Sequence, residues 1–216
     1  MESFYNKFLA YLSEENKYES VNYILTKLSI GAIDIVSLYE KILKPAMQAD
    51  YCAASDQDLC IWREHIRTSI VRTIIECCFP YVIQERDKKY HSPERGRALI
   101  VCPTEEYHEI GARMVADYFT LCGFDAVFVG ANTPQEEIVK AIEHIKPKYV
   151  ALSVTTHFNL VAADRCVKTL AEIRNRSGLN FIIITGGDAF IKNPDMSHKM
   201  GADLLLDTFE EISRLK

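Results

Sequence analysis

The sequence has no excess of positive charge and no long apolar runs, and each shortage argues against a class of protein. Its 216 residues include 25 lysines and arginines against 30 aspartates and glutamates, a net charge of −5. General nucleic-acid binders are usually basic, so direct nucleic-acid binding is not expected. No apolar run approaches the roughly 20 residues that a membrane helix needs. The acidic, amphipathic N-terminus also lacks a signal-peptide pattern, so we expect a cytoplasmic protein without membrane contact.

Two motifs are also absent. The seven cysteines include no C-x-x-C pair. A zinc site is therefore not indicated, and we expect reduced, mostly buried thiols. No G-x-G-x-x-G follows the first apolar strand of the C-terminal half. This absence disfavours a dinucleotide-binding fold.

The apolar pattern divides the chain into two domains. Residues 1–90 carry apolar side chains at helical spacing, which predicts an all-α helical bundle of four to five helices. One of these helices is expected from Leu59 to Phe79 and should end at Pro80. The charged stretch that follows contains Pro93 and Gly96, so we place a linker at 91–97.

From residue 98 the pattern alternates between strand and helix. Near-continuous apolar strands are expected where helices cover both faces of a sheet. Residues 98–216 therefore predict an α/β, Rossmann-like domain with a doubly wound, five-stranded parallel sheet. The expected strands are 98–102, 126–129, 149–153, 181–185 and 203–206, and the expected helices are 108–122, 134–145, 160–176, a short one after Pro194, and 208–215.

His108 lies where the first of these strands gives way to a helix. Parallel α/β sheets bind their ligands at that edge. Glu106 can accept a hydrogen bond from one ring nitrogen of His108 and leave the other nitrogen free for a metal. Gly111 allows a bulky ligand to approach the first helical turn. Taken alone, these residues also fit an ordinary helix start, in which Glu106 and Glu109 favour that end of the helix dipole.

Two more elements follow strands at the same predicted edge. Ser153 and Thr155 follow the third strand and turn toward one side, so their hydroxyls could donate to a buried ligand atom or cap a local turn. Gly186 and Gly187 follow the fourth strand, where they permit either the approach of a ligand tail or a tight turn. His157 is either a further polar contact or an ordinary loop histidine.

The set Glu106-x-His108-x-x-Gly111, Ser153-x-Thr155 and Gly186-Gly187, behind a helical bundle, resembles the cobalamin (vitamin B12)-binding domain family. The resemblance covers essentially the whole chain. It implies that His108 coordinates the cobalt of cobalamin from below, in place of the cofactor's own dimethylbenzimidazole base, and that Glu106 tunes its basicity. The displaced nucleotide tail would run past Ser153 and Thr155 towards the two glycines. Which form binds, adenosyl-, methyl- or hydroxocobalamin, is not specified.

Within that family the chain is most similar to the cobalamin-dependent photoreceptor regulators. Glu64-His65, on a predicted bundle helix, resembles a Glu-His motif that these regulators place over the upper face of the corrin. By that resemblance Glu64 contacts the upper ligand, and His65 can take the upper cobalt position; the alternative is a surface Glu-His pair on an amphipathic helix. The chain departs from the branch at Ala54, where the regulators have Trp, and in lacking a DNA-binding domain ahead of the bundle. Trp62, three residues before His65, is either an aromatic lid or ordinary bundle core.

Two functions follow. In the first, which the Glu64-His65 pair favours, the protein is a stand-alone sensor that signals light or cofactor status to a partner such as a transcription regulator, and is not itself an enzyme. In the second, which the absence of the Trp lid favours, it is a corrinoid carrier that passes methyl groups between methyltransferases. Both predict a protein partner. Bundle surfaces in this branch often associate, which would make a homo-oligomer.

Overall fold

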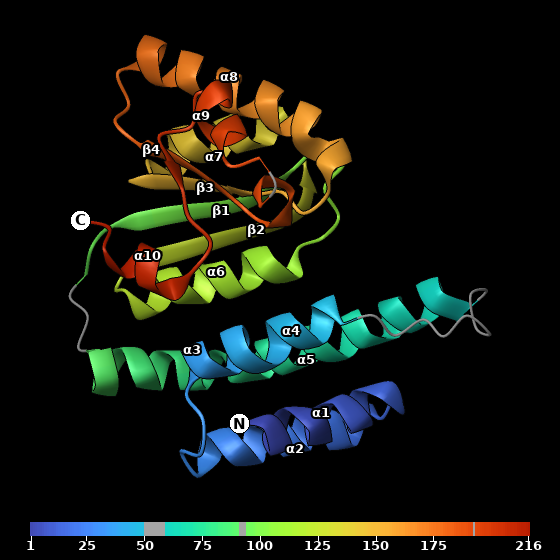
Figure 1. The fold of residues 1–216 in the computed structure, drawn as a ribbon. Coiled ribbons are helices and arrows are strands. Elements are labelled where there is room, and N and C mark those ends of the chain that lie inside the picture. The colour runs from blue at the N-terminus through green and yellow to red at the C-terminus, as the bar shows by residue number, and fades with distance from the viewer. Residues whose placement is uncertain (50–58, 91–93, 192) are drawn as a thin grey trace. The chain divides into compact units, whose positions relative to one another are not determined.

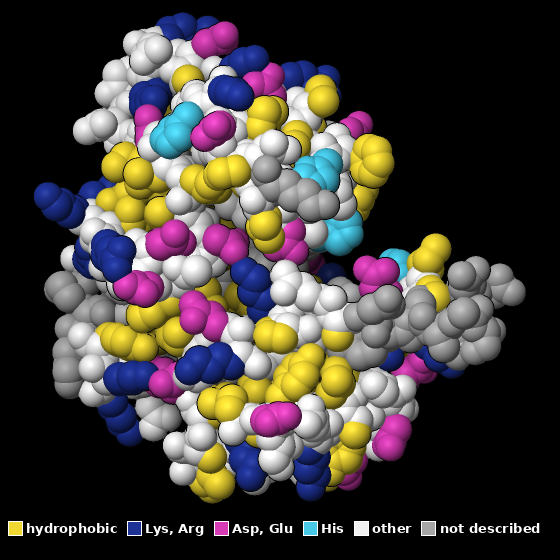
Figure 2. Space-filling view, in the orientation of Figure 1, with side chains coloured by type: hydrophobic (Ala, Val, Ile, Leu, Met, Phe, Trp, Pro, Cys, Tyr) yellow, Lys and Arg dark blue, Asp and Glu magenta, His cyan; other side chains and the backbone are white. Residues whose placement is uncertain are grey.

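A computed structural model describes residues 1–49, 59–90, 94–191 and 193–216 of the chain. The chain divides into two compact units, Met1–Lys89 and Tyr90–Lys216. Ala54, and residues 91–93 of the predicted linker, lie outside the described residues. Within the described residues, no helix has an apolar stretch that could span a bilayer. On the face shown in Figure 2, basic and acidic side chains are interspersed, without a broad region of one sign.

The described part of Met1–Lys89 is built from helices (Figure 1). Side-chain caps fix two helix starts: Asn16 accepts from the Glu19 amide at 3.1 Å, and Asp34 accepts from the Ser37 amide at 2.7 Å. The elements are α1 (Glu2–Ser13), α2 (Lys17–Ser29), α3 (Ile35–Leu38), the π-helical turn η1 (Tyr39–Leu43), α4 (Lys44–Gln48), α5 (Cys60–Glu85) and the π-helical turn η3 (Arg86–Tyr90), whose last residue begins the second unit.

Helix α5 continues through Pro80, so the prediction that this proline ends the helix is wrong. A proline inside a helix removes one backbone hydrogen bond and costs about 3 kcal/mol or more. The stripe of buried side chains on α5 extends past the proline to Val82, and burial of this stripe offsets the cost. Near its end, Glu85 accepts a hydrogen bond from the Ile35 amide at 2.8 Å, which joins α5 to the start of α3.

Most of the described cysteines are buried free thiols, as expected, but one is not reduced. Cys77, Cys78, Cys102, Cys122 and Cys166 are free thiols, and all of them except Cys77 are buried. Burial raises the pKa of Cys166 to about 12, so this thiol stays protonated at neutral pH. Cys60 is disulfide-bonded, and the expectation of reduced thiols is wrong at that position.

Tyr90–Lys216 forms the predicted α/β domain, with a five-stranded, all-parallel sheet. Each expected strand and helix of this domain is present, with ends displaced by a few residues. The elements are β1 (Arg97–Pro103), α6 (Ile110–Leu121), β2 (Asp125–Thr133), α7 (Gln135–Ile145), β3 (Tyr149–Ser153), the 3₁₀ turn η4 (His157–Asn159), α8 (Leu160–Ser177), β4 (Ile182–Gly186), the 3₁₀ turn η5 (Asp188–Phe190), α9 (Asp195–Met200), β5 (Leu204–Leu205) and α10 (Phe209–Ser213).

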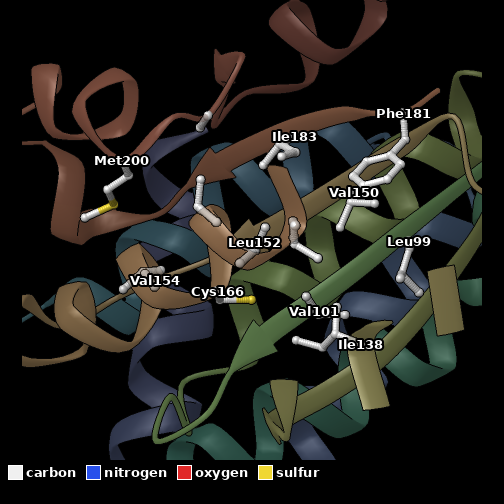
Figure 3. Close-up of a cluster of buried hydrophobic side chains, with 14 of the residues drawn as sticks. Leu99, Val101, Ile138, Val150, Leu152, Val154, Cys166, Phe181, Ile183 and Met200 are labelled. Atoms are coloured by element: carbon white, nitrogen blue, oxygen red, sulfur yellow. The ribbon is translucent and has the colours of Figure 1, made fainter. Parts of the chain in front are cut away.

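Helices cover both faces of this sheet. Helices α6 and α10 lie on one face, and α7, α8 and α9 lie on the other (Figure 1). Between the sheet and this second group, Leu99 and Val101 of β1 and Leu152 of β3 pack with Ile138 of α7 and Cys166 of α8 (Figure 3). Burial on both faces explains why the strands read as continuous apolar runs rather than alternating ones.

The strand order β2-β1-β3-β4-β5 places a topological switch point between β1 and β3. These two strands are paired directly, with Val101 opposite Leu152 near their carboxyl ends. The chain leaves β1 toward α6 on one face of the sheet, and it leaves β3 toward α8 on the other. The loops that leave these two strands therefore flank a crevice in which open α/β sheets bind ligands.

Candidate functional site

A carboxylate–imidazole pair occupies the loop after β1. The Glu106 side chain is fully buried, and its Oε1 accepts hydrogen bonds from the His108 backbone amide at 2.9 Å and from His108 Nδ1 at 2.7 Å. The second of these is the bond that the spacing of the two residues predicts. The geometry assigns the ring proton to Nδ1 and leaves the lone pair on Nε2. The ring is 50% exposed, and Nε2 makes no hydrogen bond to any described residue.

The other oxygen of Glu106 connects this loop to the loop after β3. Oε2 accepts from the Thr155 amide at 2.8 Å, from the Thr156 amide at 3.4 Å and from Asn159 Nδ2 at 3.0 Å. Burial alone would raise the pKa of Glu106, but the hydrogen bonds from Asn159, His108 and Thr155 outweigh it and lower this pKa below its ordinary value. Glu106 is therefore ionised at neutral pH and keeps the proton on His108 Nδ1.

Sequence reasoning missed Asn159. This residue is the N-cap of α8, and a reader of the sequence would expect its side chain to cap that helix. Its side chain makes no cap hydrogen bond, because the amide is directed to Glu106 instead. An asparagine before a helical pattern is the only signal in the sequence, and it points to the wrong partner. Only the pairing of β1 with β3 brings the two side chains together.

Replacing Asn159 with aspartate is expected to destabilise the protein by about 2–3 kcal/mol at pH 7. Aspartate caps helices as well as asparagine does, so the loss should come from two carboxylates facing each other in a buried site. Like charges raise the pKa of such a pair above its unfolded value, so the deficit should shrink as the pH falls. Urea unfolding measures it, with Asn175→Asp on the exposed side of α8 as control. Equal stability of Asn159→Asp and the wild type at pH 7 would contradict this account.

The end of β2 supports the same loop from the other side. The Glu105 amide donates to Asn132 Oδ1 at 2.8 Å, and the Asn132 amide donates to the Glu106 carbonyl oxygen at 2.8 Å. Glu105 and Asn132 both have left-handed backbones, with φ of +70° and +49°. Glu109 accepts from the Ala131 amide at 3.0 Å. The loop that carries His108 is thus held by both neighbouring strands.

The hydroxyls after β3 are available to a ligand. Ser153 ends β3 opposite Gly186, and it is half-buried. Thr155 uses its backbone amide to bind Glu106. Neither the Ser153 nor the Thr155 hydroxyl forms a hydrogen bond with another described residue. His157 is exposed in η4.

The glycines differ in what they accommodate. A Cβ at Gly186 would lie 2.3 Å from the carbonyl oxygen of Leu206, and one at Gly187, where φ is +102°, would lie 2.4 Å from that of Val154. The protein's own backbone therefore requires both glycines, whatever ligand approaches them. Gly111 is different, because a Cβ there would meet nothing within 4 Å. The first turn of α6, which follows the loop of His108, is therefore uncrowded at this position.

Glu64 and His65 belong to α5, in the other unit. Both are exposed, and the structure places them in Met1–Lys89, whereas the other predicted site residues lie in Tyr90–Lys216. Trp62 is 63% exposed, so the interpretation that it is ordinary bundle core is wrong. The described residues contain no group of three or more His, Cys, Asp or Glu that could hold a metal ion.

Known proteins match both the domain and the fold. Residues 96–214, more than half of the chain, match the family model described as B12 binding domain. The chain is 26% identical over 125 residues to the HTH-type transcriptional repressor CarA of Myxococcus xanthus, across 58% of this chain and 40% of that protein. The chain therefore spans less than half the length of that relative.

Two solved structures are similar to the chain at low identity, and the first of them shares its fold. The monomethylamine corrinoid protein of Methanosarcina barkeri is 17% identical and has a TM-score of 0.77, across 99% of this chain and 96% of that one. A cobalamin-binding protein from Desulfitobacterium hafniense DCB-2 is also 17% identical and has a TM-score of 0.47, across 94% and 92%. The first match extends the likeness in fold to the helical N-terminal part.

Proposed function

This chain belongs to the B12 binding domain family, and we propose that it binds cobalamin base-off, with His108 as the lower cobalt ligand. One observation carries the proposal: a buried, ionised Glu106 holds His108 Nδ1 at 2.7 Å and leaves Nε2 free on a half-exposed ring. An imidazole oriented by a carboxylate on its other nitrogen is a typical metal ligand in proteins. A Cβ at Gly111 would meet nothing within 4 Å, which is consistent with the approach of a bulky cofactor to this turn.

The other residues at this edge would hold the tail of the cofactor. The hydroxyls of Ser153 and Thr155 have no partner among the described residues, and they can donate to the displaced nucleotide. The tail would run toward Gly186 and Gly187, where the backbone is closely packed. When bound, cobalamin supplies a cobalt centre that can carry a methyl or an adenosyl group. His108, held by Glu106, would orient that centre.

We propose that the protein serves as the corrinoid carrier of a methyltransferase system. The full-length match in both directions to the monomethylamine corrinoid protein supports this role. The repressor match, in contrast, spans only 40% of that protein. A carrier must expose the upper face of its cofactor to a partner enzyme. This order of preference reverses the one drawn from the sequence.

The sensor is the second candidate, and Glu64-His65 favours it. Both side chains are exposed on α5, and by the family resemblance His65 would be the upper cobalt ligand after the cobalt–carbon bond is broken. In this role the protein would act through a partner such as a transcription regulator. The 26% identity to the repressor gives the candidate its support from sequence.

Illumination of the methylcobalamin- and adenosylcobalamin-loaded protein distinguishes the two roles. Light breaks the cobalt–carbon bond in either case, so the visible spectrum of the product is the readout. The carrier predicts the same product spectrum in the wild type and in His65→Ala, and transfer of the methyl group by a partner methyltransferase. The sensor predicts a product spectrum that changes in His65→Ala but not in His144→Ala, an exposed control on α7. A protein that binds no corrinoid in any form would contradict both.

A further inference from the structure

The exposed apolar side chains of Tyr90–Lys216 gather at one edge of the sheet. Tyr107 follows β1, Phe158 and Val161 follow β3, and Ile191 follows β4, so these four lie beyond the carboxyl ends of their strands. The described turns at the opposite edge contain no exposed large apolar side chain. The large exposed apolar residues of this unit are Tyr107, Val129, Phe158, Val161 and Ile191. Such clustering marks a surface that another molecule covers.

Two of these side chains flank the carboxylate–imidazole pair. Tyr107 precedes His108, and Phe158 precedes Asn159, whose amide donates to the same carboxylate that holds the His108 ring. Because both neighbours bind Glu106, Tyr107 and Phe158 belong to the two loops that this carboxylate joins. Tyr107 is 67% exposed and Phe158 is 92% exposed. A phenylalanine this exposed packs little within the chain, and its ring is available to a partner that would bury it.

We propose that Tyr107 and Phe158 pack against the rim of the bound corrin and set the affinity of the protein for it. This inference rests on the proposed binding of cobalamin through His108. A macrocycle held at Nε2 of the half-exposed imidazole would be wide enough to reach other residues of the loops after β1 and β3. Val161, three residues after Phe158 at the start of α8, would extend the same contact.

The test measures the dissociation constants of cobalamin and of cobinamide, which lacks the nucleotide tail. Tyr107→Ala and Phe158→Ala should each weaken binding of both compounds about ten-fold, since each removes an aromatic ring that binding would bury. Phe158→Tyr should retain most of the affinity. Tyr18→Ala, which removes an exposed aromatic side chain from α2, is the control and should bind like the wild type. The spectroscopic signature of His108 coordination should persist in all of these Tyr107, Phe158 and Tyr18 variants.

Three results would overturn this inference. Wild-type affinity in both alanine variants would show that another molecule covers these rings. Loss of affinity for cobalamin alone would place the contact on the nucleotide tail. Loss of histidine coordination in the variants would show that the rings act by positioning His108. The proposed function fails separately, if the wild type binds neither compound or if His108→Ala binds both with unchanged affinity and spectrum.

Discussion

Replacing His108 with alanine is expected to weaken cobalamin binding about 100-fold or more. Changes to residues that merely orient a metal ligand cost about 10–100-fold in affinity, and His108 is proposed as the ligand itself. Its Nε2 is the free nitrogen of a ring whose other nitrogen lies 2.7 Å from a buried carboxylate oxygen. Titration of the apoprotein with hydroxocobalamin, followed in the visible spectrum, measures the change. The spectrum of any cofactor that still binds should lack histidine coordination.

The control for this variant is His144→Ala, which removes an exposed histidine from α7. It should bind cobalamin like the wild type. Because the ring of His108 is half-exposed, imidazole added to His108→Gly should enter the vacated position and restore part of the affinity. Unchanged affinity and an unchanged spectrum in His108→Ala would refute the assignment of the lower ligand.

Glu106→Gln is expected to destabilise the protein by about 2–4 kcal/mol at pH 7 and to weaken cobalamin binding about 10–100-fold. The carboxylate accepts hydrogen bonds at both oxygens, and an amide can accept at only one. The amide NH₂ group would therefore face another donor in a buried site. Glu105→Gln, at the exposed neighbouring position, should change stability by less than about 0.5 kcal/mol. Urea unfolding of the apoprotein and cobalamin titration measure the two effects separately.

The deficit of Glu106→Gln should depend on pH. Hydrogen bonds from Asn159, His108 and Thr155 outweigh burial and lower the pKa of Glu106 in the folded state, relative to the ordinary glutamate value of about 4.3 in the unfolded chain. The stability that this shift contributes is fully present above the ordinary value and is lost as the pH falls through the lowered one. The stabilities of wild type and variant should therefore converge on acidification below pH 4. A deficit that is constant from pH 7 to pH 3 would contradict the ionised assignment.

The architecture of the α/β domain could be predicted because its buried strands are continuous runs of apolar residues in the sequence. Leu99 and Val150 belong to continuous apolar runs, which require a sheet covered on both faces. Pro80 was misjudged for the opposite reason: a local rule predicts a helix end, and the tertiary burial of α5 overrides it. Cys60 shows the same limit, since the single sequence contains no spacing signal for its disulfide bond.

At the site, the spacing of residues in the sequence was sufficient to predict contacts within one loop, but it did not predict contacts between loops. The bond from His108 to Glu106 follows from two residues in one turn. The contact of Asn159 with Glu106 depends on the pairing of β1 with β3, which no local pattern specifies. Gly186 and Gly187 left two interpretations open in the sequence, the approach of a ligand tail or a tight turn, and in the structure their missing Cβ atoms admit the carbonyl oxygens of neighbouring backbone. A glycine pair looks the same in sequence whether it admits a ligand or the chain itself.

The most direct test of the central claim is electron paramagnetic resonance of the cob(II)alamin-loaded protein, prepared with ¹⁵N-labelled histidine. An axial nitrogen splits the cobalt lines into triplets when it is ¹⁴N and into doublets when it is ¹⁵N. If His108 is the lower ligand, labelling should convert triplets into doublets, and His108→Ala should abolish the doublets. Triplets that persist in the labelled protein would show that the cofactor keeps its own base on cobalt, and would contradict this account.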